Sequence, residues 1–118
     1  MSVRKGEVSV RERLFGGQGA VRVWDLQAGR PMIPFGAVLS CELDPGGSVG
    51  AHRQEHLPEI VIGLEGSGEA TVDGVPRALD AGDVVHLPLG SVLAIRNRSD
   101  EEPLRYLIVK ALDPAQLR

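Results

Sequence analysis

The sequence predicts an all-β protein with a jelly-roll (double-stranded β-helix) barrel, and three observations carry that prediction. Fifteen glycines and eight prolines separate short β-prone runs, which is typical of many short strands rather than of helices. Two turn signals stand out: Asp73-Gly74, which tolerates the positive φ angles of a tight hairpin, and Asp44-Pro45-Gly46-Gly47. Aromatic residues make up 3% of the chain, so Val, Leu and Ile must fill the core.

Ten strands follow from the apolar runs between these turns. A double-sheet jelly roll or barrel is the architecture that accommodates so many short strands. One short helical turn is expected at Asp113-Pro114. In chain order we expect strands at Glu7–Val10, Ala20–Leu26, Ala37–Leu43, Ala51–Gln54, Glu59–Leu64, Glu69–Val72, Val75–Leu79, Asp83–Leu87, Val92–Asn97 and Leu104–Ala111.

The length and composition indicate a single domain over residues 1–118, with a barrel core at about 36–111. No apolar run reaches the roughly 18 residues that a membrane helix needs, and the first residues lack the apolar stretch of a secretory signal. A single cysteine, Cys41, fits a reducing compartment, so we expect a cytoplasmic protein. The net charge is −3 and the basic residues are scattered, which argues against a nucleic-acid partner.

Two spaced motifs carry the functional signal. The first runs Gly46, five residues, His52-Arg53-Gln54, four residues, Glu59, six residues, Gly66. The second runs Gly82, five residues, Pro88-Leu89-Gly90, two residues, Leu93, three residues, Asn97.

The side chains of His52 and Gln54 share one face of a strand, and Glu59 opens the next strand. Imidazole and carboxylate are good ligands for a divalent transition metal, whereas the Gln54 amide oxygen is a weak one. A metal-free interpretation is that the three side chains satisfy one another by hydrogen bonding inside a barrel. Cys41 lies among apolar neighbours and is expected to be a small core residue.

From about Val38 to Val109 the chain resembles the cupins, specifically the small single-domain bacterial cupins of the type 2 conserved-barrel family. The runs 58–70 and 81–90 and both motif spacings carry this resemblance. It implies a cupin barrel whose metal ligands, two histidines and a glutamate from the first motif and one histidine from the second, correspond to His52, Gln54, Glu59 and Leu93. His52 and Glu59 keep the family identity. The aliphatic Leu93 cannot ligate, so the ligand set is degenerate.

Two other histidines are weaker candidates. His56 has the parity of His52 and Gln54 if the strand stays extended, but Glu55-His56-Leu57-Pro58 is more typical of a turn. His86 alternates with Val85 and Leu87, so it faces outward if those two fill the core.

Two segments indicate contact surfaces rather than metal-binding or catalytic residues. Between Glu59 and Leu64 both strand faces are apolar; if Glu59 points inward, Ile60, Ile62 and Leu64 need an external cover. A second subunit, giving a homodimer, or the N-terminal segment would supply it. The loop Gly29–Phe35, with two prolines among large apolar residues, either lines or covers the barrel opening or packs on a partner.

Three functions compete on this evidence. The first is a binding protein whose cavity, lined by His52, Gln54, Glu59, Val61 and Leu93, holds a small molecule, with a divalent-metal site that is weak or absent. The second is a metal-dependent enzyme of dioxygenase, isomerase or lyase type that holds Fe, Mn, Ni or Zn through His52, Gln54 and Glu59. The third is a structural or regulatory dimer with a filled interior. We favour the first.

Overall fold

The computed structural model describes residues 3–30 and 32–112, and it is all-β as predicted. A 3₁₀ turn, η1 (Leu14–Gly16), accompanies ten strands. The strands are β1 (Val8–Glu12), β2 (Ala20–Asp25), β3 (Phe35–Leu43), β4 (Ser48–Arg53), β5 (Glu59–Glu65), β6 (Gly68–Val72), β7 (Val75–Ala78), β8 (Val84–Leu87), β9 (Val92–Asn97) and β10 (Leu104–Ala111).

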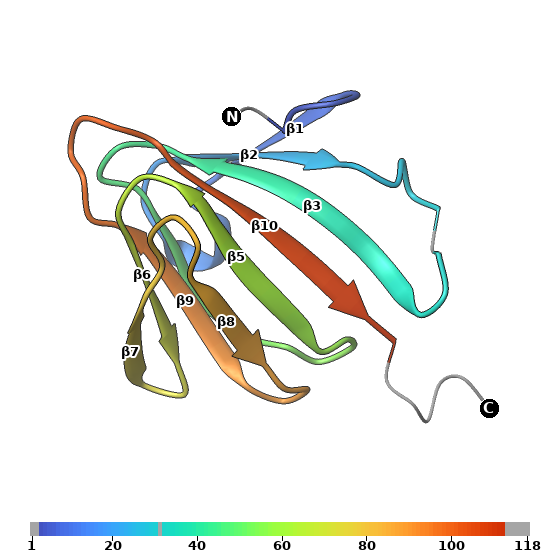
Figure 1. The fold of residues 1–118 in the computed structure, drawn as a ribbon. Coiled ribbons are helices and arrows are strands. Elements are labelled where there is room, and N and C mark those ends of the chain that lie inside the picture. Colours follow the sequence, from blue (N-terminus) through green and yellow to red (C-terminus); the bar gives the residue numbers. More distant parts are fainter. Residues whose placement is uncertain (1–2, 31, 113–118) are drawn as a thin grey trace.

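The strands form two facing sheets, which gives the jelly roll (Figure 1). The larger sheet has the order β1-β2-β3-β10-β5-β8, and the smaller has the order β4-β9-β6-β7. Within each sheet, every pairing of the described strands is antiparallel, as hairpin and Greek-key connections require. The fold class and all ten expected strands are therefore confirmed.

The differences from the sequence-based expectation are local. The fourth strand begins at Ser48 and ends at Arg53, so Gln54 lies just after it. The 3₁₀ turn over Leu14–Gly16 was not expected, because it has no apolar periodicity. The helical turn expected at Asp113-Pro114 lies outside the described residues.

Both predicted turns are present. Asp73 and Gly74 have φ angles of 50° and 80° and connect Val72 to its partner Val75, as a type I′ hairpin demands. At the other turn, the Gly47 amide donates to the Asp44 carbonyl at 2.9 Å.

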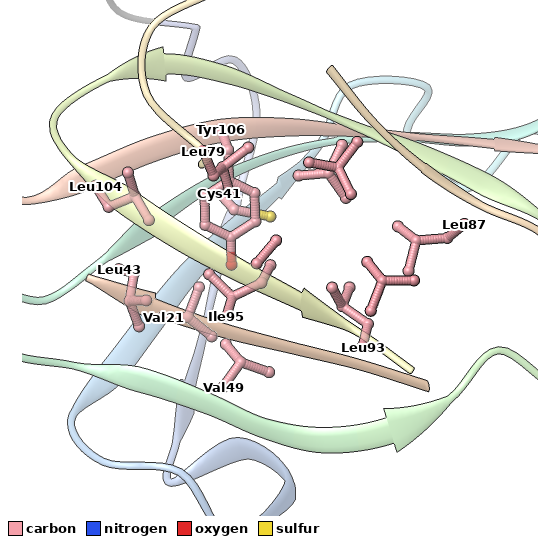
Figure 2. Close-up of a cluster of buried hydrophobic side chains, with 14 residues drawn as sticks. Val21, Cys41, Leu43, Val49, Leu79, Leu87, Leu93, Ile95, Leu104 and Tyr106 are labelled. Atoms are coloured by element: carbon pink, nitrogen blue, oxygen red, sulfur yellow. The ribbon is translucent and has the colours of Figure 1, made fainter. Parts of the chain in front are cut away.

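The core lies between the two sheets and consists of aliphatic side chains with one tyrosine and one cysteine (Figure 2). Leu79 and Leu104 lie at one end of this cluster, while Leu87 and Leu93 lie at the other. Val85 and Leu87 are buried and His86 is exposed, so the outward orientation expected of His86 is correct.

The outer face of the larger sheet carries the apolar stripe noted in the sequence. Ile60, Ile62 and Leu64 are half-buried there. The strand β1 pairs with β2 at one edge of the sheet, and β8 beside β5 forms the opposite edge. Strand β1 itself therefore does not cover the β5 stripe, but the segment before it lies over the outer face at β2 and β3, where the Arg4 guanidinium is 5.9 Å from the Trp24 ring centroid and 3.5 Å from Glu42 Oε2. None of the described helical residues forms a segment of the length and hydropathy that a bilayer crossing takes.

Candidate functional site

A cavity of about 1320 Å³ lies between the sheets and is large enough for a small organic molecule. Four of the five residues expected to line a pocket, His52, Gln54, Glu59 and Leu93, do line it. Val61 does not: its side chain faces inward but is fully buried in the core and lies outside the cavity lining. Much of the wall is apolar, with Val49, Leu39, Leu93, Ile95 and Ile108 among its residues.

A β-bulge aims His52 into this cavity. Val49 pairs with Ile95 and His52 pairs with Leu93, so three steps along β4 match two along β9. In a regular strand, residues 49 and 52 would face opposite sides, because they are an odd number of positions apart. The extra residue of the bulge lets both side chains face inward. His52 and Leu93 are direct cross-strand partners, and their side chains therefore project from the same face.

The His52 ring is held on two sides. Its Nδ1 lies 2.9 Å from the Gly50 carbonyl oxygen. Because a carbonyl only accepts, Nδ1 carries the proton and Nε2 is the free acceptor of the neutral ring. The Phe15 ring stacks on the imidazole with centroids 4.1 Å apart and planes 12° from parallel.

Phe15 reaches this position through an unusual backbone. Its φ of 53° is left-handed, and Arg13 has a φ of 50°. The segment passes so close to β4 that a Cβ added at Gly50 would lie 1.8 Å from the Phe15 carbonyl oxygen. A residue without a side chain at position 50 is therefore what lets η1 place Phe15 on His52.

Two backbone hydrogen bonds hold Gln54 at the wall of the cavity. Its amide donates to the Ser91 carbonyl at 2.8 Å, and its carbonyl accepts from the Gly90 amide at 2.7 Å. The side chain is 6% exposed, and its Nε2 has no hydrogen-bond partner.

Glu59 is buried beside a lysine. On β5 it lies directly opposite Lys110 of β10, and Lys110 Nζ is 3.6 Å from Glu59 Oε2. That separation gives electrostatic attraction but exceeds a hydrogen bond, so Oε2 is left without a hydrogen-bond partner. Burial raises the pKa of the Glu59 carboxyl, and the Lys110 charge opposes that rise.

The remaining polar candidates have lesser roles. His56 is exposed at a bend, as the turn interpretation expected, and it belongs to the cavity lining. Cys41 also lines the cavity, and burial raises the pKa of its thiol to about 12. A thiol that stays protonated is a poor nucleophile, so its assignment to the core is confirmed. The described residues of the loop 29–35 contribute nothing to the cavity lining.

Comparison with known proteins identifies the family. The family model described as Cupin domain matches residues 39–110, which is more than half of the chain. The chain belongs to the cupin family. One curated relative is the dimethylsulfoniopropionate lyase DddW of Ruegeria pomeroyi. It is 41% identical over 71 residues, which cover 59% of this chain and 46% of the lyase. The chain thus matches less than half the length of that relative.

Solved structures agree on the fold. A Thermotoga maritima protein described as a predicted oxalate decarboxylase superposes with a TM-score of 0.82 at 29% identity, covering 96% of this chain and all of that one. A Cupin 2 conserved-barrel protein of Salinispora arenicola superposes with a TM-score of 0.71 at 30% identity, covering 99% and 92%.

Cupins often bind a metal ion, but the residues here do not fit one. Leu93 offers hydrocarbon where a ligand is needed, and the Lys110 ammonium already lies against the Glu59 carboxylate. A divalent cation at Glu59 would be repelled by that ammonium at short range. Across residues 3–30 and 32–112, no three His, Cys, Asp or Glu side chains are grouped to hold a metal ion.

Sequence reasoning missed Lys110 and Phe15 at this site. Lys110 shares the inward parity of Tyr106 and Ile108, but a lysine near the end of a strand is usually solvent-exposed. Only the register of β10 against β5 reveals its partner. No local signal points from Phe15 to a histidine so far along the chain.

Proposed function

We propose that this cupin binds a small organic molecule in the cavity between its sheets and does so without a resident divalent metal. The observation that carries the proposal is the cavity itself, which is about 1320 Å³ and has apolar walls around His52, Gln54 and Glu59. The proposal includes no metal because Lys110 lies beside Glu59 and because the aliphatic Leu93 cannot act as a ligand. A filled interior, the third interpretation of the sequence, does not agree with a cavity of this size.

The test combines metal analysis with a fluorescent probe. Protein purified without a histidine tag is expected to contain far less than one equivalent of Fe, Mn, Ni or Zn by mass spectrometry. One equivalent of the uncharged dye N-phenyl-1-naphthylamine is expected to bind with a blue-shifted emission, because the cavity wall is apolar. Leu39→Trp, which places a large ring in the cavity, should weaken dye binding roughly tenfold or more, because the ring occupies volume that the dye would fill.

Equal dye binding by the wild type and the Leu39→Trp variant would contradict the proposal. Stoichiometric metal that disappears in His52→Ala would also overturn it and favour an enzyme. That second candidate, a metal-dependent enzyme of lyase, isomerase or dioxygenase type using His52, Gln54 and Glu59, is supported by the 41% identity to DddW. Consumption of dimethylsulfoniopropionate by metal-supplemented protein, followed by NMR, tests it directly.

We also propose that two copies pair through the outer face of the larger sheet. A row of alternating charge crosses this face, formed by the cross-strand neighbours Arg22, Glu42, Arg105 and Glu65, in which Arg105 pairs with Glu42 and Glu65. A row of alternating sign is complementary to a copy of itself turned by a two-fold axis. Next to it lie the half-buried Ile60 and Ile62 and the exposed Val84, whose cross-strand partner is Ile62.

Val84→Glu is expected to weaken this association roughly 100-fold or more, because it places an unpaired charge among apolar side chains. The matched control is Val75→Glu: Val75 is 53% exposed on the other sheet, against 60% for Val84. Sedimentation velocity over a micromolar concentration series measures both variants. A wild-type protein that stays monomeric at tens of micromolar, or equal behaviour of both variants, would refute the dimer.

A further inference from the structure

Two buried side-chain atoms of the described chain lack hydrogen-bond partners, and both belong to residues that line the cavity. They are Nε2 of Gln54 and Oε2 of Glu59. Gln54 is 6% exposed and Glu59 is 4% exposed, so water at the surface does not reach them freely. Folded proteins pair nearly all such atoms, and an exception at a cavity calls for a partner that the chain itself does not supply.

The backbones of both residues are held in place. The backbone N–H and C=O of Gln54 both hydrogen-bond to the turn at Gly90 and Ser91, which fixes the position from which the side-chain amide extends. Glu59 is fixed in β5 between its cross-strand partners Lys110 and Leu87.

We infer that Gln54 Nε2 and Glu59 Oε2 form the polar end of the ligand site and recognise an uncharged group that both accepts and donates a hydrogen bond. This inference rests on the proposed binding function. Nε2 donates to an acceptor such as a carbonyl oxygen, and Oε2 accepts from a donor such as an amide N–H or a hydroxyl. A primary carboxamide or an alcohol supplies both.

The charges around the two atoms select against an ionised group. The Lys110 ammonium, 3.6 Å from Oε2, balances the Glu59 carboxylate. An anion would meet the carboxylate and a cation would meet the ammonium at short range. The body of the ligand is apolar, because Val49, Leu39, Leu93, Ile95 and Ile108 line the cavity around this polar end.

A matched set of single-ring probes tests the chemical class. Benzamide and benzyl alcohol present the uncharged donor and acceptor, toluene presents neither, and benzoate and benzylammonium present a charge. By calorimetry or NMR titration of the full chain, benzamide and benzyl alcohol are expected to bind roughly tenfold or more tightly than toluene and than both ions, which corresponds to one well-made hydrogen bond to a charged or buried group.

Gln54→Met tests the residue. It should lower benzamide affinity several-fold, because one of the two proposed hydrogen bonds is lost, without lowering toluene affinity. In the absence of probe, it should raise the melting temperature by about 3 °C or more, since a buried donor without a partner is removed. Glu59→Gln, which keeps the size of the side chain, should lower benzamide affinity in the same assay.

Gln27→Met is the matched control. Gln27 is also buried, but its Nε2 donates to the Arg30 carbonyl at 2.7 Å, and it lies outside the cavity lining. This variant should lower the melting temperature and leave benzamide binding unchanged. A lowered melting temperature for Gln54→Met would show a structural role and overturn the inference.

The outcomes separate this inference from the proposed function. If toluene and the naphthalene dye bind but the wild type does not prefer benzamide or benzyl alcohol, the inference fails and the cavity remains a binding site. If the dye and every probe fail to bind, the proposed function fails, and the inference fails with it.

Discussion

Replacing both Gln54 and Leu93 with histidine is expected to give the cavity a tight divalent-metal site. Leu93 is the direct cross-strand partner of His52, so an imidazole at position 93 projects from the same face as the existing one. Gln54 lines the same cavity and is already aimed there by its bonded backbone. Three imidazoles and the Glu59 carboxylate then form a donor set that suits Fe, Mn, Ni or Zn.

Affinity for Ni²⁺ or Zn²⁺ should rise roughly 100-fold or more over the wild type, because two strong ligands replace a hydrocarbon and a weak amide. The Lys110 ammonium, 3.6 Å from Glu59 Oε2, still repels a cation at that carboxylate, so the expected gain in affinity comes from the two new imidazoles. Calorimetric titration measures the affinity, and the single variants Gln54→His and Leu93→His, each one ligand short, should be intermediate. A folded double variant that binds no metal would mean that positions 52, 54, 59 and 93 do not converge as described.

Gly50→Ala is expected to destabilise the protein by about 3 kcal/mol and to detach Phe15 from His52, because the added Cβ meets main chain rather than a flexible side chain. The Cβ would lie 1.8 Å from the Phe15 carbonyl oxygen, so either the 3₁₀ segment or β4 must move. Thermal or urea unfolding measures the stability. NMR reports the geometry, since a ring stacked 4.1 Å away shifts the His52 ring protons upfield.

Phe15→Ala distinguishes the effect of losing the Phe15 ring from the effect of displacing its backbone. The Phe15 side chain is 56% exposed, so its removal should cost about 1 kcal/mol or less, yet it should abolish the upfield shift of His52. Gly50→Ala should lose both the shift and the stability. A Gly50→Ala variant with wild-type stability and unchanged His52 resonances would show that the close approach of η1 to β4 is wrong.

Much of the fold could be predicted because strand patterns and turn chemistry are local. Asp73-Gly74 specifies its hairpin through the φ angles that these two residues tolerate, and Val85 and Leu87 determine the outward side of His86 by alternation alone. The 3₁₀ turn at Leu14–Gly16 escaped prediction, since left-handed residues such as Phe15 are held by contacts with β4 and not by their own preference.

The candidate site was predictable in part for the same reason. The motif spacing identified His52, Gln54, Glu59 and Leu93, all of which line the cavity. The inclusion of Val61 followed from parity, and parity cannot tell a wall of the cavity from the packed core further along the same strand. Gln54 was expected within a strand, whereas its position after β4 depends on the bonds to the turn at residues 90–91.

By itself, the sequence determined that this chain is a β-barrel with a cupin motif pair and a hydrocarbon at one ligand position, because those properties depend on residue identity, spacing and period. The tertiary structure alone decided which charge faces Glu59, which ring supports His52 and which buried atoms lack partners. Lys110 and Phe15 lie far from those residues along the chain, and strand register and backbone approach bring them together. Such registers are set by the packing of the whole barrel, so no local pattern records them.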